Sequence, residues 1–181
     1  LNDFAIVSDS FSNIIEKDTN ESIPIQIGAT LPYYKKGNFK IRSNNYTYKG
    51  SIASKNKVDL IKYAYQFLNT PYLWGGKSIL GIDCSGFTQQ VYVLSGYNIP
   101  RDAYQQAEIG ETFLYKHRLP TDLVFFIKNN RIHHVGILIS KNQIIHASGQ
   151  VRIDEFTEKG IIHNKTKELT HRFHSIKRII E

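Results

Sequence analysis

Residues 71–87 read PYLWGGKSILGIDCSGF, a glycine-rich loop that runs into the start of a predicted helix. The stretch contains the only cysteine of the chain, Cys84, and the only tryptophan, Trp74. The continuation CSGFTQQVYVLSG has apolar residues at helical spacing and ends at Gly96, a typical helix stop. Its predicted inner face consists of Phe87, Val91 and Leu94. We therefore place Cys84 in the first turn of a helix.

That position suits a nucleophile, because a thiol must populate its thiolate against a free pKa of about 8.5. Unpaired backbone N–H groups and the helix dipole favour an anion at a helix start. A neighbouring imidazole helps more, since it takes the proton. The carboxylate of Asp83 acts in the opposite direction and must point elsewhere if Cys84 is catalytic. The alternative is that Cys84 is a small buried apolar residue.

The composition is that of an ordinary globular chain of 181 residues, of which 41% are hydrophobic. This length allows one core, or a catalytic domain with a small companion. The longest apolar run, Leu123–Ile127, is too short to span a membrane. The net charge of +7 fits a polyanionic partner such as a cell wall. The basic residues are scattered along the chain, so we expect no nucleic-acid binding.

The first 50 residues alternate β-forming residues with turn residues, which predicts a small β-barrel. Helical spacing begins at Lys57–Leu68, with Asn56 as the expected N-cap. The predicted apolar stripe of this helix is Leu60, Ile61, Ala64, Phe67 and Leu68. We therefore expect two domains, 1–52 and 53–181.

After Asp122 the chain reads as strands: DLVFFIK, HHVGILIS, QIIHASG and VRIDEF, with SIKRII as a closing strand. Short turn signals separate these strands, which predicts an antiparallel meander. Because helices precede the sheet, the expected class of the second domain is α+β.

The turn after HHVGILIS determines which histidine faces Cys84, because side chains alternate along a strand. We expect a three-residue loop, Ser140–Asn142, with Asn142 in the left-handed conformation. This register pairs Gly136 with His146 and places His134 and His146 on one face, about 7–8 Å apart. A two-residue loop would instead pair His133 with His146.

The resulting hypothesis is a Cys-His-His site. Cys84 attacks, His134 serves as base and then acid, and His146 orients His134. A metal site is the alternative use of the histidines, but the sequence has no HExxH motif and no second cysteine. We therefore expect neither a metal nor a cofactor.

The motifs PYLWGG, GIDCSGF, DLVFF, HHVGILIS and IIHASG, in this order, resemble the NlpC/P60 family of papain-like cysteine peptidases, over about residues 55–181. The segment IPRDAYQQAEIG and the β-rich N-terminal region resemble the subgroup with bacterial SH3 (SH3b) domains, whose members are γ-D-glutamyl-L-diamino acid endopeptidases. The resemblance implies a papain-like catalytic domain after an SH3b-like barrel or part of one.

The resemblance also implies roles for individual residues. Cys84 matches the nucleophile, His134 the base and His146 the third polar member. Tyr72 matches a tyrosine whose hydroxyl could help the Cys84 backbone N–H to hold an oxyanion.

Four further residues match or border the substrate cleft: Asp83, Ser85, Asp102 and Trp74. The resemblance implies that Asp83 binds the free amine of an N-terminal L-Ala. The structural alternatives are a helix N-cap for Asp83, core packing for Trp74, which we favour, and a salt bridge for Arg101 and Asp102.

Two departures from the family pattern stand out. Thr121 occupies a position where the family commonly has glycine, and the SH3b-like region is short. Tyr33, Tyr34 and Glu21 are its candidates for binding the substrate amine.

The expected function is a peptidoglycan hydrolase that cleaves the γ-D-glutamyl-diamino acid bond of stem peptides. We expect a monomer of the cell envelope, periplasmic or secreted, with a cytoplasmic recycling enzyme as the alternative. The rival functions are an N-acetylmuramoyl-L-alanine amidase or a thiol acyltransferase on the same fold, and a non-catalytic wall-binding module.

Overall fold

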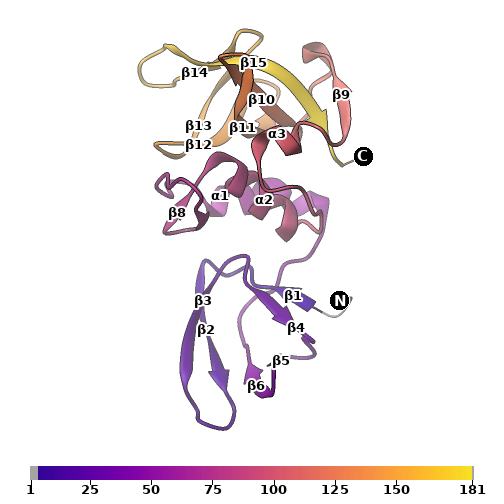
Figure 1. Ribbon diagram of the computed structural model, residues 1–181, viewed down its shortest axis with the longest axis vertical. Coiled ribbons are helices and arrows are strands. Elements are labelled where there is room, and N and C mark those ends of the chain that lie inside the picture. The colour runs from indigo at the N-terminus through magenta and orange to yellow at the C-terminus, as the bar shows by residue number, and fades with distance from the viewer. Residues whose placement is uncertain (1–3, 181) are drawn as a thin grey trace.

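The computed structural model describes residues 4–180, and Figure 1 shows three layers along the long axis. The N-terminal β region is at one end, the helices are in the middle, and a β-barrel lies at the other end (Figure 1). Within residues 4–180, none of the helices is long and apolar enough to cross a membrane.

The N-terminal region consists of short strands, as predicted, and the structure pairs them antiparallel. The strands are β1 (Phe4–Ile6), β2 (Phe11–Glu16), β3 (Ser22–Gln26), β4 (Thr30–Pro32), β5 (Asn38–Ile41) and β6 (Asn44–Thr47). β1 pairs with β4, and the other strands form a sheet of order β3-β2-β6-β5. A small apolar cluster that includes Val7, Leu31 and Tyr48 fills the space between them.

This region also packs against the helical layer. Ile6, Ile27 and Ala53 belong to the same buried cluster as Leu60 of the first helix. The Gln66 side chain donates a hydrogen bond to the Ser8 carbonyl oxygen at 3.2 Å. The two parts of the chain are therefore joined by a continuous core.

The predicted first helix consists of a 3-10 turn, η1 (Lys57–Asp59), followed by α1 (Leu60–Gln66). Asn56 caps it as expected, since its side chain accepts a hydrogen bond from Val58 N. The predicted stripe is wrong at Leu68, which is 37% exposed, because the helix ends at Gln66 and the chain turns. Tyr63 is buried on that face.

The glycine loop forms a small hairpin, β7 (Lys77–Ser78) and β8 (Gly81–Ile82), and leads into α2 (Cys84–Leu94). The predicted inner face of α2 is confirmed, because Phe87, Val91 and Leu94 are all buried. Gly96 ends the helix with a φ of 92°, which favours glycine. A third short helix, α3 (Ala103–Gln106), follows.

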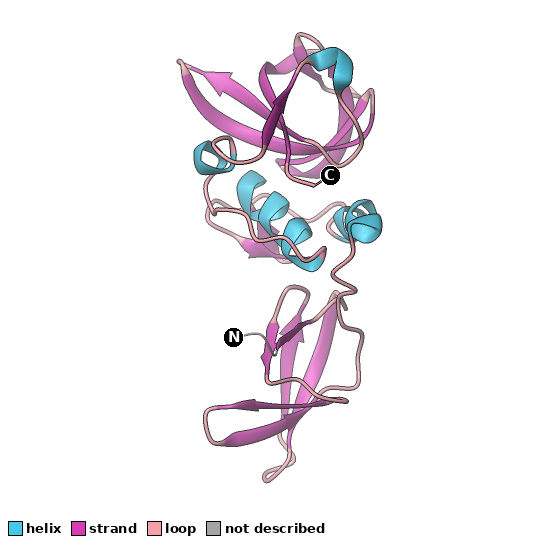
Figure 2. Ribbon diagram, turned by 90° about the vertical axis from the view of Figure 1, so that its right-hand side faces the viewer, coloured by secondary structure: helices cyan, strands magenta, loops and turns pink. Residues whose placement is uncertain are grey.

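The predicted meander is confirmed, and it closes on itself. Its elements are β9 (Glu111–Phe113), η2 (Tyr115–His117), β10 (Leu123–Lys128), β11 (Arg131–Ser140), β12 (Gln143–Ser148), β13 (Gln150–Thr157), β14 (Gly160–Ile162) and β15 (Leu169–Arg178). β10 pairs with both β11 and β15, which closes the barrel seen end-on in Figure 2. Val124, Phe126 and Phe156 fill its interior, and α2 packs on its outside.

The turn between β11 and β12 differs from the prediction. Ser140 pairs with Gln143, so the loop has two residues, and Asn142 is not among the described non-glycine residues with positive φ. A bulge between Leu138 and Ser140 compensates for the shorter loop. The pair Ile137↔Ile145 therefore keeps the predicted register, and a Cβ atom on Gly136 would lie 2.9 Å from His146 Cβ.

Candidate active site

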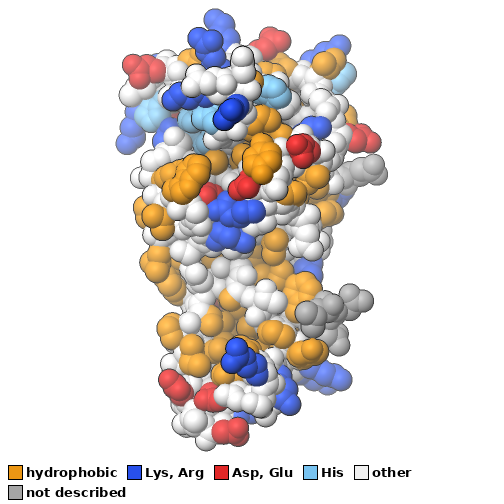
Figure 3. Space-filling model, viewed as in Figure 1, with side chains coloured by type: hydrophobic (Ala, Val, Ile, Leu, Met, Phe, Trp, Pro, Cys, Tyr) orange, Lys and Arg blue, Asp and Glu red, His pale blue; other side chains and the backbone are white. Residues whose placement is uncertain are grey.

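A cavity of about 1270 Å³ lies where the glycine loop and the starts of α2 and α3 face the barrel. Except for His146, all predicted site residues line it: Tyr72, Trp74, Asp83, Cys84, Ser85, Asp102 and His134. His146 is fully buried behind His134. On the face viewed in Figure 3, histidine side chains lie beside lysine and arginine side chains on the barrel, above a mixed acidic and basic group.

Cys84 begins α2 and is 7% exposed. Burial raises the pKa of its thiol to about 11, although a hydrogen bond from the Val135 backbone N–H acts in the opposite direction. The thiol is therefore protonated at neutral pH in the ligand-free protein. Gly86 lets α2 approach the loop closely, because a Cβ atom there would lie 2.5 Å from the Gly76 carbonyl oxygen.

His134 and His146 are in direct contact, which confirms the predicted shared face. The distance from His134 Nε2 to His146 Nδ1 is 2.8 Å, and His146 Nε2 lies 3.0 Å from Asp154 Oδ2. Burial lowers the pKa of both imidazoles below the ordinary value of 6.5, most strongly for His134. Both rings are therefore neutral at pH 7.

These contacts assign the ring protons, because a carboxylate can only accept hydrogen bonds. His146 Nε2 must donate to Asp154, so the neutral ring accepts at Nδ1. His134 then donates from Nε2, which leaves the lone pair on its Nδ1. His134 Nδ1 is therefore the nitrogen that can take a proton from a thiol.

Asp154, the last residue of this series of hydrogen bonds, was missed by the sequence interpretation. Burial tends to raise its pKa, but hydrogen bonds from His146, the Asn164 backbone N–H and Arg152 hold that pKa far below its usual range. His146 pairs with Arg152 across β12 and β13, so Asp154 is a diagonal neighbour of His146. The same register argument applied to VRIDEF could have found it.

His171 is a second missed residue. Its ring stacks on that of His134, with centroids 4.1 Å apart and an interplanar angle of 27°. Burial, followed by the neighbouring His146, lowers the pKa of His171 to about 3. His171 lies on β15, which reaches this position only because the barrel closes.

The three histidines could also hold a metal ion, since one ring nitrogen from each of His134, His146 and His171 lies within 4.8 Å of the others. Such an ion would compete with the hydrogen bond of 2.8 Å between His134 and His146, and His146 is also bonded to Asp154. The present arrangement suits proton transfer, and the expected absence of a metal stays a prediction.

At the other end of the cavity, the Asp83 carboxylate has four close donors. Arg101 donates to both oxygens, at 2.9 and 2.6 Å, and the backbone N–H groups of Gly86 and Gly75 donate at 2.7 and 2.8 Å. Burial tends to raise the pKa of Asp83, but these bonds lower it. The N-cap alternative for Asp83 and the salt bridge of Arg101 are thus both present.

Arg101 also donates to Ser85 Oγ at 2.9 Å, so it holds two residues that the resemblance assigns to the cleft. Asp102, the other residue of the suggested salt bridge, instead caps α3 with a capping box. It lies on the cavity lining at that end.

Tyr72 and Trp74 lie on the loop before α2. The Tyr72 N–H donates to the Gly149 carbonyl oxygen at 2.9 Å. Burial and the nearby Cys84 raise the pKa of the Tyr72 phenol, which therefore keeps its proton. The favoured core packing of Trp74 is wrong, since this side chain is 84% exposed at the cavity, where the chain turns at Gly75 with a φ of 77°.

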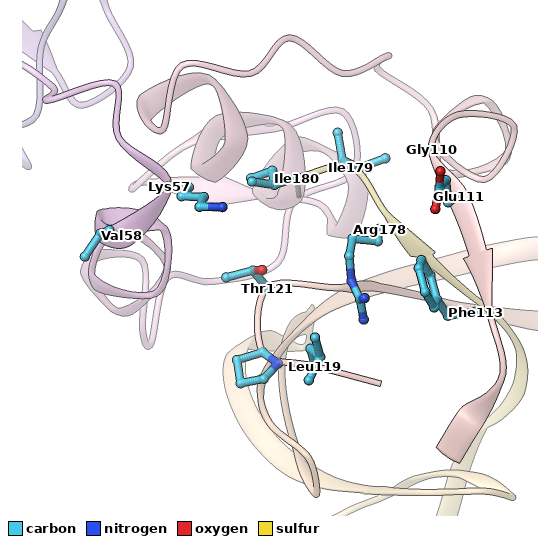
Figure 4. Close-up of a pocket in the computed structure, with 11 residues that line it drawn as sticks. Lys57, Val58, Gly110, Glu111, Phe113, Leu119, Thr121, Arg178, Ile179 and Ile180 are labelled. Carbon is cyan, nitrogen blue, oxygen red and sulfur yellow. The ribbon is translucent and has the colours of Figure 1, made fainter. Parts of the chain in front are cut away.

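A second cavity, of about 600 Å³, lies on a different part of the protein, between η1 and the end of β15 (Figure 4). Its lining is largely apolar, with Ile179 and Ile180 beside Arg178 and Glu111. The described lining residues include neither a thiol nor an imidazole, so this cavity does not share the chemistry of the first.

A thiol at a helix start, backed by two neutral imidazoles and a carboxylate, defines the protein as a candidate thiol hydrolase. Residues 69–170 match the NlpC/P60 family, and the chain belongs to this family. A crystal structure of an NlpC/P60 family protein from Bacillus cereus has a TM-score of 0.79 and 25% identity, covering 98% of this chain and 63% of that one.

Two curated relatives illustrate the sequence likeness. The gamma-D-glutamyl-L-lysine dipeptidyl-peptidase of Bacillus subtilis is 40% identical over 49% of this chain and 31% of its own length. The probable endopeptidase NlpC homolog of Haemophilus influenzae is 34% identical over 77% of this chain and 76% of its own. The chain thus spans about a third of the first relative, 31% of its length.

Proposed function

We propose that this protein is a cysteine peptidase that cleaves the bond between γ-D-Glu and the diamino acid in peptidoglycan stem peptides. The observation that carries the proposal is the series of hydrogen bonds from His134 through His146 to Asp154. It leaves a lone pair on Nδ1 of His134, which lines the same cavity as Cys84. The name of the Bacillus subtilis relative, gamma-D-glutamyl-L-lysine dipeptidyl-peptidase, supports the choice of bond.

In the acylation step, His134 Nδ1 takes the Cys84 proton as Sγ attacks the carbonyl carbon of γ-D-Glu. The C–N bond then breaks, the leaving amine receives that proton from His134, and a thioester remains on Cys84. In the second step, His134 takes a proton from water, and the resulting hydroxide attacks the thioester. Return of the proton to sulfur releases the γ-glutamyl acid.

The Tyr72 phenol and the Cys84 backbone N–H would donate to the oxyanion of both tetrahedral intermediates. The raised pKa of Tyr72 supports this role, because the hydroxyl stays protonated over the pH range of the reaction. Because the thiol and His134 are both neutral at rest, proton transfer accompanies attack.

Asp83 and Ser85 would form the part of the site that holds the L-Ala end of the substrate. Arg101 already binds both side chains, so a substrate amine has to share the Asp83 carboxylate with the guanidinium. Trp74, exposed at the cavity, would cover the bound peptide. We assign residues 1–52 to an SH3b-like domain of the subgroup and residues 53–181 to the peptidase domain, in a monomer of the cell envelope.

The test is incubation with L-Ala-γ-D-Glu-diaminopimelate and with its N-acetylated analogue, followed by mass spectrometry. We expect release of diaminopimelate from the free-amine substrate, and a Cys84→Ala variant should lose at least about 10³-fold in rate. Equal cleavage of both substrates would show that Asp83 does not bind the substrate amine.

Loss of L-Ala from an N-acetylmuramoyl substrate, with the γ-glutamyl bond intact, would identify an amidase instead. If neither bond is cut while wall fragments still bind, the protein is a binding module and the proposal is wrong.

A further inference from the structure

The hairpin that joins β10 to β11 brings two basic side chains to the active-site cavity. Lys128 and Arg131 are directly opposite each other across the hairpin, on either side of the turn Asn129–Asn130. Both residues line the cavity that also contains Cys84 and His134. Arg101, the other arginine of the lining, is instead paired with Asp83.

Like charges that face each other across two strands destabilise a sheet. Both turn residues have left-handed φ values, 51° for Asn129 and 58° for Asn130, which matches a tight two-residue hairpin turn and holds Lys128 and Arg131 in that pairing. Among residues 4–180, no hydrogen bond or ion pair engages either side chain. The unfavourable pair therefore has a positive charge that an anion can neutralise.

The chemistry of the proposed function indicates which part of a substrate would lie there. The leaving nitrogen must come within hydrogen-bond reach of His134, which protonates it. The leaving peptide therefore lies on the histidine side of Cys84. Arg131 is three residues before His134 on β11, so its backbone is about 10 Å away along the strand. Its long side chain brings the guanidinium within reach of a group one or two residues beyond the cleaved bond.

We propose that Lys128 and Arg131 form a subsite for a carboxylate of the leaving peptide. This inference rests on the proposed function and narrows its substrate class: the preferred stem peptides carry a free carboxylate just beyond the cleaved bond. Substrates in which that carboxylate is amidated bind less tightly, because they leave the two cations unneutralised.

The experiment compares two substrates, L-Ala-γ-D-Glu-L-Lys-D-Ala with a free C-terminus and the same peptide with a C-terminal carboxamide. For the wild-type protein we expect kcat/KM to favour the acid by about tenfold, through KM, since one charge-assisted contact is lost in the amide. In the double variant Lys128→Gln/Arg131→Gln the ratio should fall to about one, and high salt should weaken the wild-type preference.

The matched control is Lys141→Gln, which removes a lysine at the turn on the opposite end of β11 and should keep the acid preference. Calorimetric binding of both peptides to the Cys84→Ala variant reads the same preference without catalysis. Equal kcat/KM for the two peptides, with cleavage intact, overturns the subsite but not the proposed function. If neither peptide is cleaved, the proposed function fails, and equal binding of both peptides then overturns the subsite as well.

Thermal unfolding supplies a further check that does not depend on turnover. Replacing both members of a like-charge pair, as in Lys128→Gln/Arg131→Gln, removes their repulsion and should leave the ligand-free protein as stable as before or more stable. The acid peptide should raise the Tm of Cys84→Ala more than the amide does, and Lys128→Gln/Arg131→Gln in that background should abolish the difference. A strong loss of ligand-free stability in the variant would instead assign the pair a structural role.

Discussion

At one end of the active-site cavity, Asp83 and Arg101 neutralise each other as a carboxylate and a guanidinium. At the other end, His134, His146 and His171 remain uncharged, because burial lowers their pKa values. The first end satisfies its charge with a permanent partner. At the second end the three imidazoles are neutral, so a proton acceptor stays in a buried place, and the Asp154 carboxylate behind them is paired with Arg152.

This difference indicates that the Asp83–Arg101 pair supports the structure, whereas the histidines carry out the proton transfer. The Asp83–Arg101 pair caps α2 and ties it to the segment before α3, so it fixes where Cys84 begins its helix. The histidine end has a defined order of hydrogen bonds that ends in one anion, Asp154. We therefore expect changes at the histidine end to reduce activity most, and changes at the Asp83 end to reduce stability most.

The largest effect is expected for Asp154→Asn. The amide can donate to His146 Nε2, which would reverse the ring protons of His146 and His134 and remove the lone pair that accepts the thiol proton. We predict a fall in kcat of at least about 100-fold with a folded protein, measured by steady-state kinetics and circular dichroism.

The matched control for that change is Asp9→Asn, which removes a carboxylate that binds Tyr48 and Ser51 in the N-terminal region. It should leave kcat near the wild-type value. If the folded Asp154→Asn variant keeps nearly full activity, the hydrogen bond from His146 to Asp154 does not determine which ring nitrogens of His146 and His134 carry the protons.

An intermediate effect, on stability, is expected for Arg101→Gln. This change leaves the Asp83 carboxylate buried with two backbone donors and a long hydrogen bond of 3.5 Å from Ser85 Oγ. Because the Arg101 side chain is 31% exposed, we discount the cost of a broken buried pair to about 1–3 kcal/mol in the free energy of unfolding. Urea denaturation measures it.

The double variant Asp83→Asn/Arg101→Gln sharpens this result, since asparagine still caps a helix and carries no charge. It should be more stable than Arg101→Gln alone. Additive losses would show that the two side chains do not act as a pair.

The smallest effect is expected in the pH dependence of stability. Burial lowers the folded pKa of His171 to about 3, below the ordinary value of 6.5, so unfolding takes up a proton between these pH values. Stability from this residue is complete above pH 6.5 and is lost as the pH falls towards 3. His134 and His146 act in the same direction.

His171→Phe keeps an aromatic ring against His134 and removes the titrating group. We predict that it reduces proton uptake on unfolding by up to about one proton, measured as a shallower slope of Tm with pH between 3 and 6.5. An unchanged slope would mean that His171 titrates normally in the folded protein.

Much of the site was predictable because local patterns determine it. Helical spacing placed Cys84 at the start of α2, and strand alternation placed His134 and His146 on one face. The predicted loop was wrong, yet the histidine register was right, because the bulge in β11 offsets the shorter turn. Asp154 was within reach of the same argument, whereas the exposure of Trp74 follows from the path of the loop.

The sequence by itself determined the thiol, its helix and the histidine face, since these depend on neighbours within a helix or a single hairpin. Only the tertiary structure placed His171 on His134, because β15 meets β10 through barrel closure. Only the tertiary structure showed Arg101 on Asp83 and placed Lys128 and Arg131, which have no ion-pair partner among residues 4–180, on the cavity that Cys84 also lines. Such contacts join segments distant in sequence, and no local periodicity encodes the burial and charge balance that they create.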